Sequence, residues 1–179
     1  PADEPLLAPS VSRLTQTIET FGLTEGALQG KILAEAQQET VFVVDNVTYT
    51  IPVMGGYNVK NALIAIGMGH HFDVPEAAIQ AGLAGFQLTK NRTQWLEAGN
   101  GASLLSDVYN ANPKAMGLVL DSFKKLPIKG RRIAVLADML ELGPDSGTMH
   151  ASMAEHMDDA FQVVFLYGNE MRALPKGLE

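Results

Sequence analysis

The 179-residue chain contains no cysteine, which removes disulfide bonds, thiol nucleophiles and cysteine-ligated zinc from consideration. Charged residues are also sparse, at 18%, and they sum to a net charge of −7. This acidic balance argues against a nucleic acid or an anionic membrane as partner, because both need a basic protein surface. We therefore expect no nucleic-acid partner, and any phosphate ligand must be held by a local pocket.

Long apolar runs are missing as well. The longest nearly uninterrupted one, residues 62–69, is far shorter than the roughly 20 residues that a membrane helix requires. The N-terminus shows no charged segment followed by an apolar one, as a signal peptide would. These absences predict a soluble, cytoplasmic protein without membrane insertion. The chain begins at Pro1 rather than at methionine, and we expect it to be a fragment of a longer protein.

The residues that are present, 46% of them hydrophobic, are those of a folded protein. Charge is distributed unevenly along it. Residues 1–85 hold nine acidic and three basic side chains, whereas residues 86–179 hold eleven and ten. This shift predicts a domain boundary near Gly85.

The first part reads as β-rich with two helices. We expect a strand over Thr15–Phe21 and a hairpin made of Thr40–Val44 and Val47–Val53. A helix entered through Asn58 should bury four apolar side chains at helical spacing, namely Val59, Ala62, Leu63 and Ile66. Asp73 and Glu76 have the spacing of a capping box, which predicts a second helix opening there.

The second part alternates strand and helix. The apolar patterns predict strands over Ser103–Asp107, Arg132–Ala137 and Val163–Tyr167, with helices over Pro113–Lys125 and residues 146–158 between them. Alternation of this kind is typical of an α/β fold with a Rossmann-like parallel sheet.

Polar residues follow two of these strands, and ligands of open parallel sheets collect beyond the carboxyl ends of the strands. The strands end in Asp107 and Asp138, and Tyr109, Asn110 and Asn112 follow the first of them. Amides and a phenol suit recognition of a peptide or a nucleotide. The alternative is structural, with Asn112 capping the following helix, Asn110 forming a turn and Asp107 serving as a polar strand end.

Three further residues are candidates. Asn58 and Asn61 lie three apart and share a helix face, where they could read an adenine edge or cap the helix. Arg92 lies just past the expected boundary and could meet a phosphate or form a surface ion pair. A phosphate-binding Gly-Lys-Ser/Thr loop and a Gly-x-Ser-x-Gly elbow are both absent, and the histidines suggest no metal site.

Several of these segments resemble the Mur ligases. They include Asp107-Val-Tyr-Asn-Ala-Asn-Pro-Lys-Ala-Met116, residues 133–143 with His150, and residues 88–93. Upstream, Gly56-Tyr-Asn-Val-Lys-Asn-Ala-Leu63 is similar to the family's Gly-x-His-Asn-x-x-Asn-Ala-Leu. The resemblance covers nearly the whole chain. It implies that residues 1–85 are the end of the central ATP-binding domain and that residues 86–179 are most of the C-terminal Rossmann-like domain.

The resemblance implies ATP-driven amide bond formation, in the branch of the family that adds D-alanyl-D-alanine to UDP-N-acetylmuramoyl-tripeptide for peptidoglycan synthesis. ATP and Mg²⁺ are the implied cofactors. By motif position, the family's ATP-binding residues fall on Asn58 and Asn61 for the adenine, Arg92 for a phosphate and Asp107 for the ribose. By the same comparison, the family's binding site for the dipeptide would be lined by Tyr109, Asn110, Asn112 and Asp138.

The chain departs from the family pattern at two positions, with Tyr57 where histidine is usual and Ala137 where glycine is usual. The family's phosphate loop and magnesium ligands are expected upstream of Pro1, so we assign no catalytic residue here and expect the fragment alone to be inactive. Two alternatives stay open. One is a non-catalytic nucleotide- or protein-binding module of ligase-like fold, and the other is a different Mur-type amide ligase.

Overall fold

The computed structural model describes residues 1–177 except 3, 5 and 6. It divides the chain into two compact units, Pro1–Gln87 and Leu88–Glu179, which are called the first and second units below. Both units mix helices and strands, in agreement with the predicted α/β class. None of the helices in the described part of the chain has the length and apolar character needed to cross a membrane.

The first unit is built around an antiparallel sheet in the order β3-β4-β5. Its strands are β3 (Lys31–Ala36), β4 (Glu39–Val44) and β5 (Val47–Ile51). The predicted hairpin is confirmed as β4 and β5, which turn at Asp45 and Asn46 with φ of 46° and 69°. Positive φ at both central residues is the hairpin geometry that matches strand twist.

The described residues before this sheet form little regular structure. They form the short helix α1 (Ala8–Val11) and the two-residue strands β1 (Phe21–Gly22) and β2 (Leu28–Gln29). The predicted strand over Thr15–Phe21 is therefore wrong except at its last residue. Its β-branched composition favours a strand, but such propensity yields one only where a partner strand is available.

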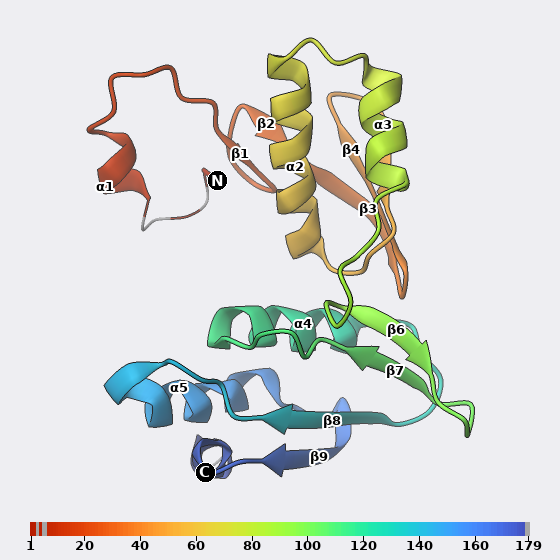
Figure 1. Cartoon of the computed structure of the whole chain (residues 1–179), viewed down its shortest axis with the longest axis vertical. Coiled ribbons are helices and arrows are strands. Elements are labelled where there is room, and N and C mark those ends of the chain that lie inside the picture. The colour runs from red at the N-terminus through yellow and green to blue at the C-terminus, as the bar shows by residue number, and fades with distance from the viewer. Residues whose placement is uncertain (3, 5–6, 178–179) are drawn as a thin grey trace. The chain divides into compact units, whose positions relative to one another are not determined.

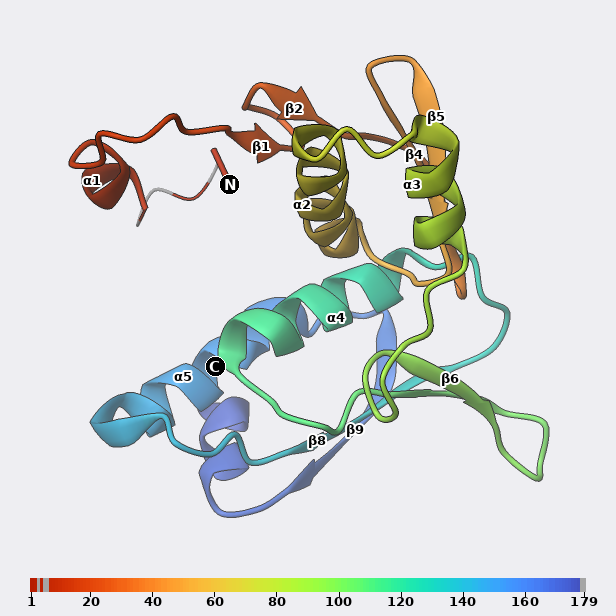
Figure 2. The same cartoon turned by 45° about the horizontal axis from the view of Figure 1, so that its top comes forward.

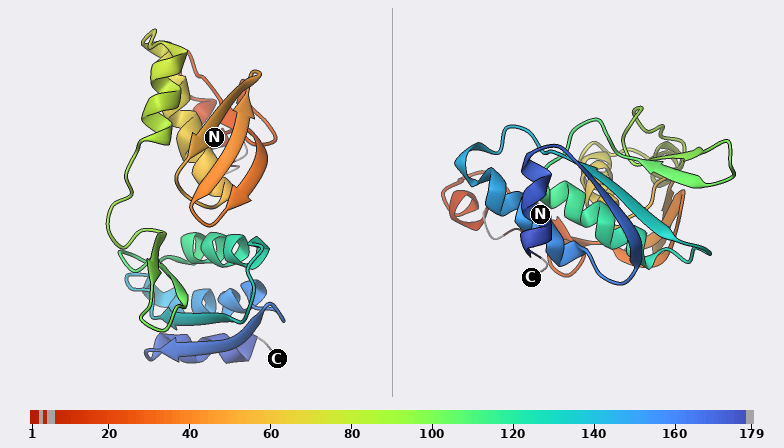
Figure 3. Two further views of the ribbon diagram at one scale, coloured as in Figure 1. Left: turned by 90° about the vertical axis from the view of Figure 1, so that its right-hand side faces the viewer. Right: turned by 90° about the horizontal axis from the view of Figure 1, so that it is seen from below.

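Helices α2 (Gly56–His71) and α3 (Glu76–Ala84) pack beside this sheet (Figures 1 and 2). The left view of Figure 3 shows α2 running along the sheet. The predicted α2 stripe is confirmed, because its buried residues are Val59, Ala62, Leu63 and Ile66.

The predicted capping box of α3 is wrong. Asp73 lies in the left-handed region at φ 54°, and the residue before the helix is Pro75, without a side-chain cap. The Glu76 carboxylate instead accepts a hydrogen bond from the buried Tyr49 hydroxyl and lies 3.0 Å from His70 Nε2. Burial and the Glu76 carboxylate raise the pKa of Tyr49, whereas the hydrogen bond from Tyr49 lowers the pKa of Glu76. This cluster joins α2, α3 and β5.

The second unit opens with an antiparallel hairpin of β6 (Gln94–Glu97) and β7 (Ser103–Ser106). Then follow α4 (Pro113–Lys125), β8 (Arg132–Ala137), α5 (Ser146–Ser152) and β9 (Phe161–Tyr167). Strands β8 and β9 pair in parallel, as predicted (Figure 1). Strand β7, however, pairs with β6, and no pairing with β8 is found in the described residues. The predicted helix over 146–158 continues past α5 only as a 3₁₀ turn, Met153–His156.

The core of the second unit lies on one face of β8 and β9. Side chains of this face, including Ala134 and Leu136, pack with Leu120 of α4, Met153 and residues of the C-terminal 3₁₀ helix Glu170–Gly177. The opposite face carries large exposed side chains, namely Ile133, Val135, Phe165 and Tyr167. Parallel strands are usually covered on both faces, so this pair departs from the common pattern.

Candidate functional site

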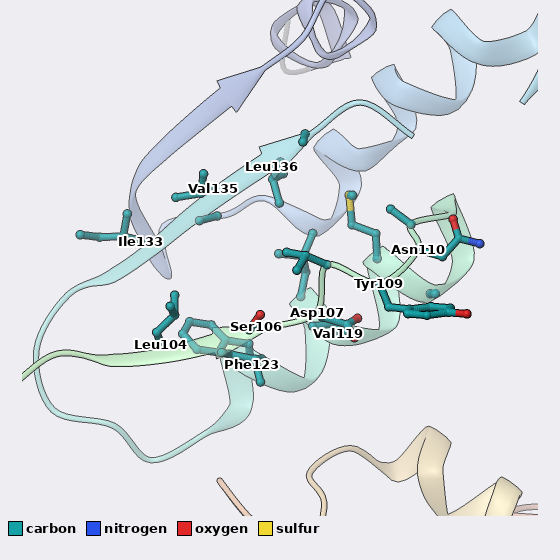
Figure 4. A pocket seen from close by; sticks show the side chains of 18 of the residues that line it. Leu104, Ser106, Asp107, Tyr109, Asn110, Val119, Phe123, Ile133, Val135 and Leu136 are labelled. Carbon is teal, nitrogen blue, oxygen red and sulfur yellow. The ribbon is translucent and has the colours of Figure 1, made fainter. Parts of the chain in front are cut away.

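A cavity of about 650 Å³ lies within the second unit, between β7, α4 and β8 (Figure 4). Its walls are mainly apolar, and Leu104, Phe123 and Ile133 lie toward one end. The polar side chains of Tyr109 and Asn110 lie toward the other end, near the loop that leads from β7 into α4. An apolar cavity with a few convergent polar groups is the usual form of a ligand site.

Asp107 follows β7 directly and is half-buried. Its Oδ1 accepts a hydrogen bond from the backbone N–H of Thr93 at 2.8 Å. The carboxylate therefore fixes the segment that enters β6. A carboxylate has about four lone-pair positions, so this bond leaves Asp107 able to accept further donors.

Arg92 and Tyr109 come together at the same end of the hairpin. The guanidinium carbon Cζ lies 4.2 Å from the centroid of the Tyr109 ring, in cation–π geometry. Both side chains are exposed. Three residues that the sequence singled out for separate roles, Arg92, Asp107 and Tyr109, thus form one cluster.

Asn112 caps α4, as the structural alternative predicted. Its Oδ1 accepts a hydrogen bond from the Ala115 N–H at 2.9 Å, and Pro113 occupies the first helical position. Asn110 is exposed in the preceding loop and lines the cavity.

Asp138 follows β8, and its carboxylate is engaged by the backbone. Oδ2 accepts from the Asn169 N–H at 2.9 Å and Oδ1 from the Met171 N–H at 2.8 Å. Desolvation opposes ionisation of Asp138, but hydrogen bonds from Met171, Glu170 and Asn169 hold its pKa below the usual value. Asp138 thereby anchors the start of the C-terminal 3₁₀ helix to the end of β8.

The loop after β8 is held from its other side by His150. This side chain is fully buried, and its Nε2 accepts a hydrogen bond from the Met139 N–H at 2.9 Å. Its Nδ1 lies 2.8 Å from the Ser146 carbonyl oxygen, to which it must donate. The sequence drew attention to His150 only within a motif. No local sequence pattern indicates that a histidine will accept a hydrogen bond from the backbone of a distant loop.

The remaining candidates lie in the first unit, at the start of α2. Asn58 is not the helix cap, because α2 begins at Gly56 after Gly55. Its Nδ2 donates to the Met54 carbonyl at 2.8 Å, and Asn61 Nδ2 lies 3.4 Å from Asn58 Oδ1. The two amides therefore share one face, as predicted, and Asn61 is exposed.

Residues 91–178 match the family described as "Mur ligase, glutamate ligase domain". The chain is 32% identical over 169 residues to the UDP-N-acetylmuramoyl-tripeptide--D-alanyl-D-alanine ligase of Bacillus subtilis (strain 168), which covers 93% of this chain and 36% of the relative. The corresponding ligase of Escherichia coli (strain K12) is 32% identical over 110 residues, covering 62% of this chain and 24% of that relative.

Solved structures give the same fold. A crystal structure of MurF from Acinetobacter baumannii superposes with a TM-score of 0.81 at 23% identity, covering 90% of this chain and 36% of that one. The MurF ligase of Thermotoga maritima in complex with ADP gives 0.80 at 21% identity, with coverage of 96% and 40%. The chain spans about a third of the length of the curated relatives that it matches.

Proposed function

The chain belongs to the Mur ligase family, and on this premise we propose that it is part of an ATP-dependent ligase that adds D-alanyl-D-alanine to UDP-N-acetylmuramoyl-tripeptide. In this proposal, residues 1–85 are the end of the central ATP-binding domain and residues 86–179 are the C-terminal domain. The division between the compact units, at Gln87 and Leu88, is compatible with that assignment. The curated relatives, which are named as D-alanyl-D-alanine ligases, favour this assignment over the two alternatives drawn from the sequence.

The observation that carries the proposal is the cluster of Arg92, Asp107 and Tyr109 at the end of β7. A guanidinium offers planar donors to phosphate, and a carboxylate accepts from the two hydroxyls of a ribose. We assign Arg92 to an ATP phosphate and Asp107 to the ribose. Both groups suit these roles, because Arg92 contacts an aromatic ring, which is not a hydrogen-bond acceptor of its in-plane donors, and Asp107 is bonded to Thr93 through one oxygen.

Asn58 and Asn61 of the first unit are assigned to the adenine. An adenine edge presents both a donor and an acceptor, and side-chain amides can answer both. The Asn58 amide is oriented by its hydrogen bond to Met54, while Asn61 is exposed beside it. The assignment to adenine depends more on Asn61, whose amide is exposed, than on Asn58, whose amide already donates to Met54.

The reaction consists of two group transfers. The terminal carboxylate of the tripeptide attacks the γ-phosphorus of ATP, so that a C–O–P linkage forms and ADP leaves. The amine of D-alanyl-D-alanine then attacks the acyl carbon. The C–N bond forms, the amine loses a proton and phosphate departs. An arginine near the transferring phosphoryl group stabilises its charge, which is the role open to Arg92.

We place the dipeptide beside the loop that contains Tyr109, Asn110 and Asn112. Asn110 is exposed at the cavity end and has amide groups suited to a peptide backbone. Asn112 contributes through the loop that it fixes by capping α4, and Asp138 through the loop that it anchors after β8.

Magnesium is the expected partner of ATP in such a reaction. In the described part of the chain, however, no three side chains of histidine, cysteine, aspartate or glutamate gather into a group that would hold a metal ion. None of the roles assigned above depends on a magnesium ion.

Isothermal titration of the chain with ADP tests the nucleotide assignment. We compare the native chain with Arg92→Ala and with Asp107→Asn, which keeps an oxygen to accept from Thr93 while removing the charge. We expect binding in the native chain and weaker binding in both variants. Undiminished binding in both would refute the assigned roles, and no binding to the native chain would refute a preformed nucleotide half-site.

A further inference from the structure

The aromatic ring of Tyr109 contacts Arg92, the residue of this cluster that is assigned to a phosphate. Arg92 Cζ lies 4.2 Å from the ring centroid, and the Tyr109 side chain is 61% exposed. A guanidinium is planar, and its N–H donors lie in that plane. A guanidinium that lies flat on a ring gives one face to it and keeps its N–H donors directed outward.

The backbones that carry these two side chains are joined to each other. The Asn91 carbonyl accepts from the N–H groups of Val108 and Tyr109 at 3.0 and 3.1 Å. On the other side of Arg92, the Thr93 N–H donates to Asp107 at 2.8 Å. Arg92 and Tyr109 thus extend from one hydrogen-bonded frame, and their contact does not depend on two independently moving loops.

The conformation around Arg92 is also unusual. Asn91 and Thr93, the residues on either side of it, have φ of 64° and 45°. Asparagine tolerates the left-handed region, but a β-branched residue such as Thr93 is rarely found there. A strained conformation persists only where its surroundings enforce it, and such positions gather at functional sites. Here the strain fixes the direction in which Arg92 leaves the backbone.

We propose that Tyr109 is a positioning residue for Arg92, holding the guanidinium by its face so that the in-plane donors meet an oxyanion. This deepens the proposed function, on which it rests, because the oxyanion class includes the phosphates of ATP. It also gives Tyr109 a role distinct from lining the dipeptide side. The ring reduces the rotamer freedom that the long arginine side chain would otherwise lose on binding.

The test compares Tyr109→Phe, which keeps the ring, with Tyr109→Leu, which removes it. NMR reports the stacking directly, because the ring shifts the Arg92 side-chain protons upfield. Titration with inorganic pyrophosphate, followed at Arg92 Nε–H, reports oxyanion binding. We expect Tyr109→Phe to behave as the native chain. Tyr109→Leu should lose the upfield shift and roughly two- to five-fold in affinity, the ratio equivalent to about 0.5–1 kcal/mol for an exposed cation–π contact.

Two results would overturn the proposal, and they differ in what else they overturn. If Tyr109→Leu binds pyrophosphate as tightly as the native chain, Tyr109 does not position Arg92, while the phosphate role of Arg92 stands. If pyrophosphate leaves the Arg92 signal of the native chain unmoved, the positioning role and the phosphate assignment both fail. Unchanged amide signals of the β6–β7 hairpin in both variants verify that the fold is intact.

Discussion

Replacing Gly117 by alanine should destabilise the second unit, although glycine is a poor helix former. Gly117 is buried in the middle of α4. A Cβ atom at this position would lie 2.4 Å from Nε2 and 2.7 Å from Cε1 of His156. The ring would have to move by more than 1 Å to reach a normal contact of about 3.5 Å. That movement would draw His156 Nδ1 away from Asp121 Oδ2, from which it lies 2.9 Å.

Two effects of opposite sign decide the magnitude. Alanine gains about 1 kcal/mol over glycine in a helix interior. Overpacking costs about 1–3 kcal/mol, and losing the hydrogen bond to Asp121 costs about 0.5–1.5 kcal/mol. The unfavourable terms are larger, so Gly117→Ala should lower the free energy of unfolding by about 0.5–3.5 kcal/mol.

Urea unfolding followed by tryptophan fluorescence measures this change. Trp95 is the single tryptophan, and its ring stacks on Phe123 of α4 at 6.1 Å between centroids. With an m-value of about 2 kcal/mol/M, the midpoint should fall by about 1 M. In a His156→Ala background the clash is gone, and Gly117→Ala should instead stabilise by about 1 kcal/mol. An unchanged or raised midpoint with His156 present would refute the reasoning.

Three further changes test other contacts. Asn112→Ala removes the cap of α4 and should cost about 1 kcal/mol, seen in the same urea assay, whereas Asn112→Asp should retain stability; equal losses would exclude capping. The hydrogen bond from Tyr49 lowers the pKa of Glu76 in the folded state. The ionised Glu76 therefore stabilises the fold fully above the ordinary pKa of a glutamate, and this stabilisation is lost as the pH falls through the lowered folded-state pKa. Glu76→Gln should therefore reduce the loss of first-unit stability between about pH 7 and about pH 3, measured by circular dichroism, and an unchanged loss would contradict this. His150→Leu leaves the buried Met139 N–H without its acceptor and should lower the free energy of unfolding, measured in urea, by about 1–3 kcal/mol. An unchanged free energy of unfolding would contradict this role of His150.

The sequence predicted those elements whose pattern is local. The buried stripe of α2, the bounds of α4 and the bounds of β8 all appear as expected, because apolar spacing and the Asn112 cap specify them within one segment. Strand β3 was missed because its residues are mostly exposed and show no apolar alternation. It exists through pairing with β4, which is a tertiary effect.

The candidate site shows the same limit. The position of Asp107 at a strand end could be read from the sequence, but its bond to Thr93 depends on the register of the β6–β7 hairpin. The contact between Arg92 and Tyr109 depends on that register too. For Glu76, the capping-box spacing was misleading, because a buried tyrosine hydroxyl on β5 needed the same carboxylate. Which partner the Glu76 carboxylate takes is decided by tertiary packing, which the local sequence does not show.

The exposed apolar face of β8 and β9 affects how the chain behaves in solution. Val135 is 70% exposed, Phe165 57% and Tyr167 78%, so rings and branched aliphatic groups meet water side by side. Such a surface favours self-association, and the net charge of −7 opposes it by mutual repulsion between molecules. Sulfate salts screen that repulsion and strengthen apolar association. The chain should therefore salt out readily and bind fluorescent hydrophobic dyes while still fully folded, so dye fluorescence is an unsafe measure of its unfolding.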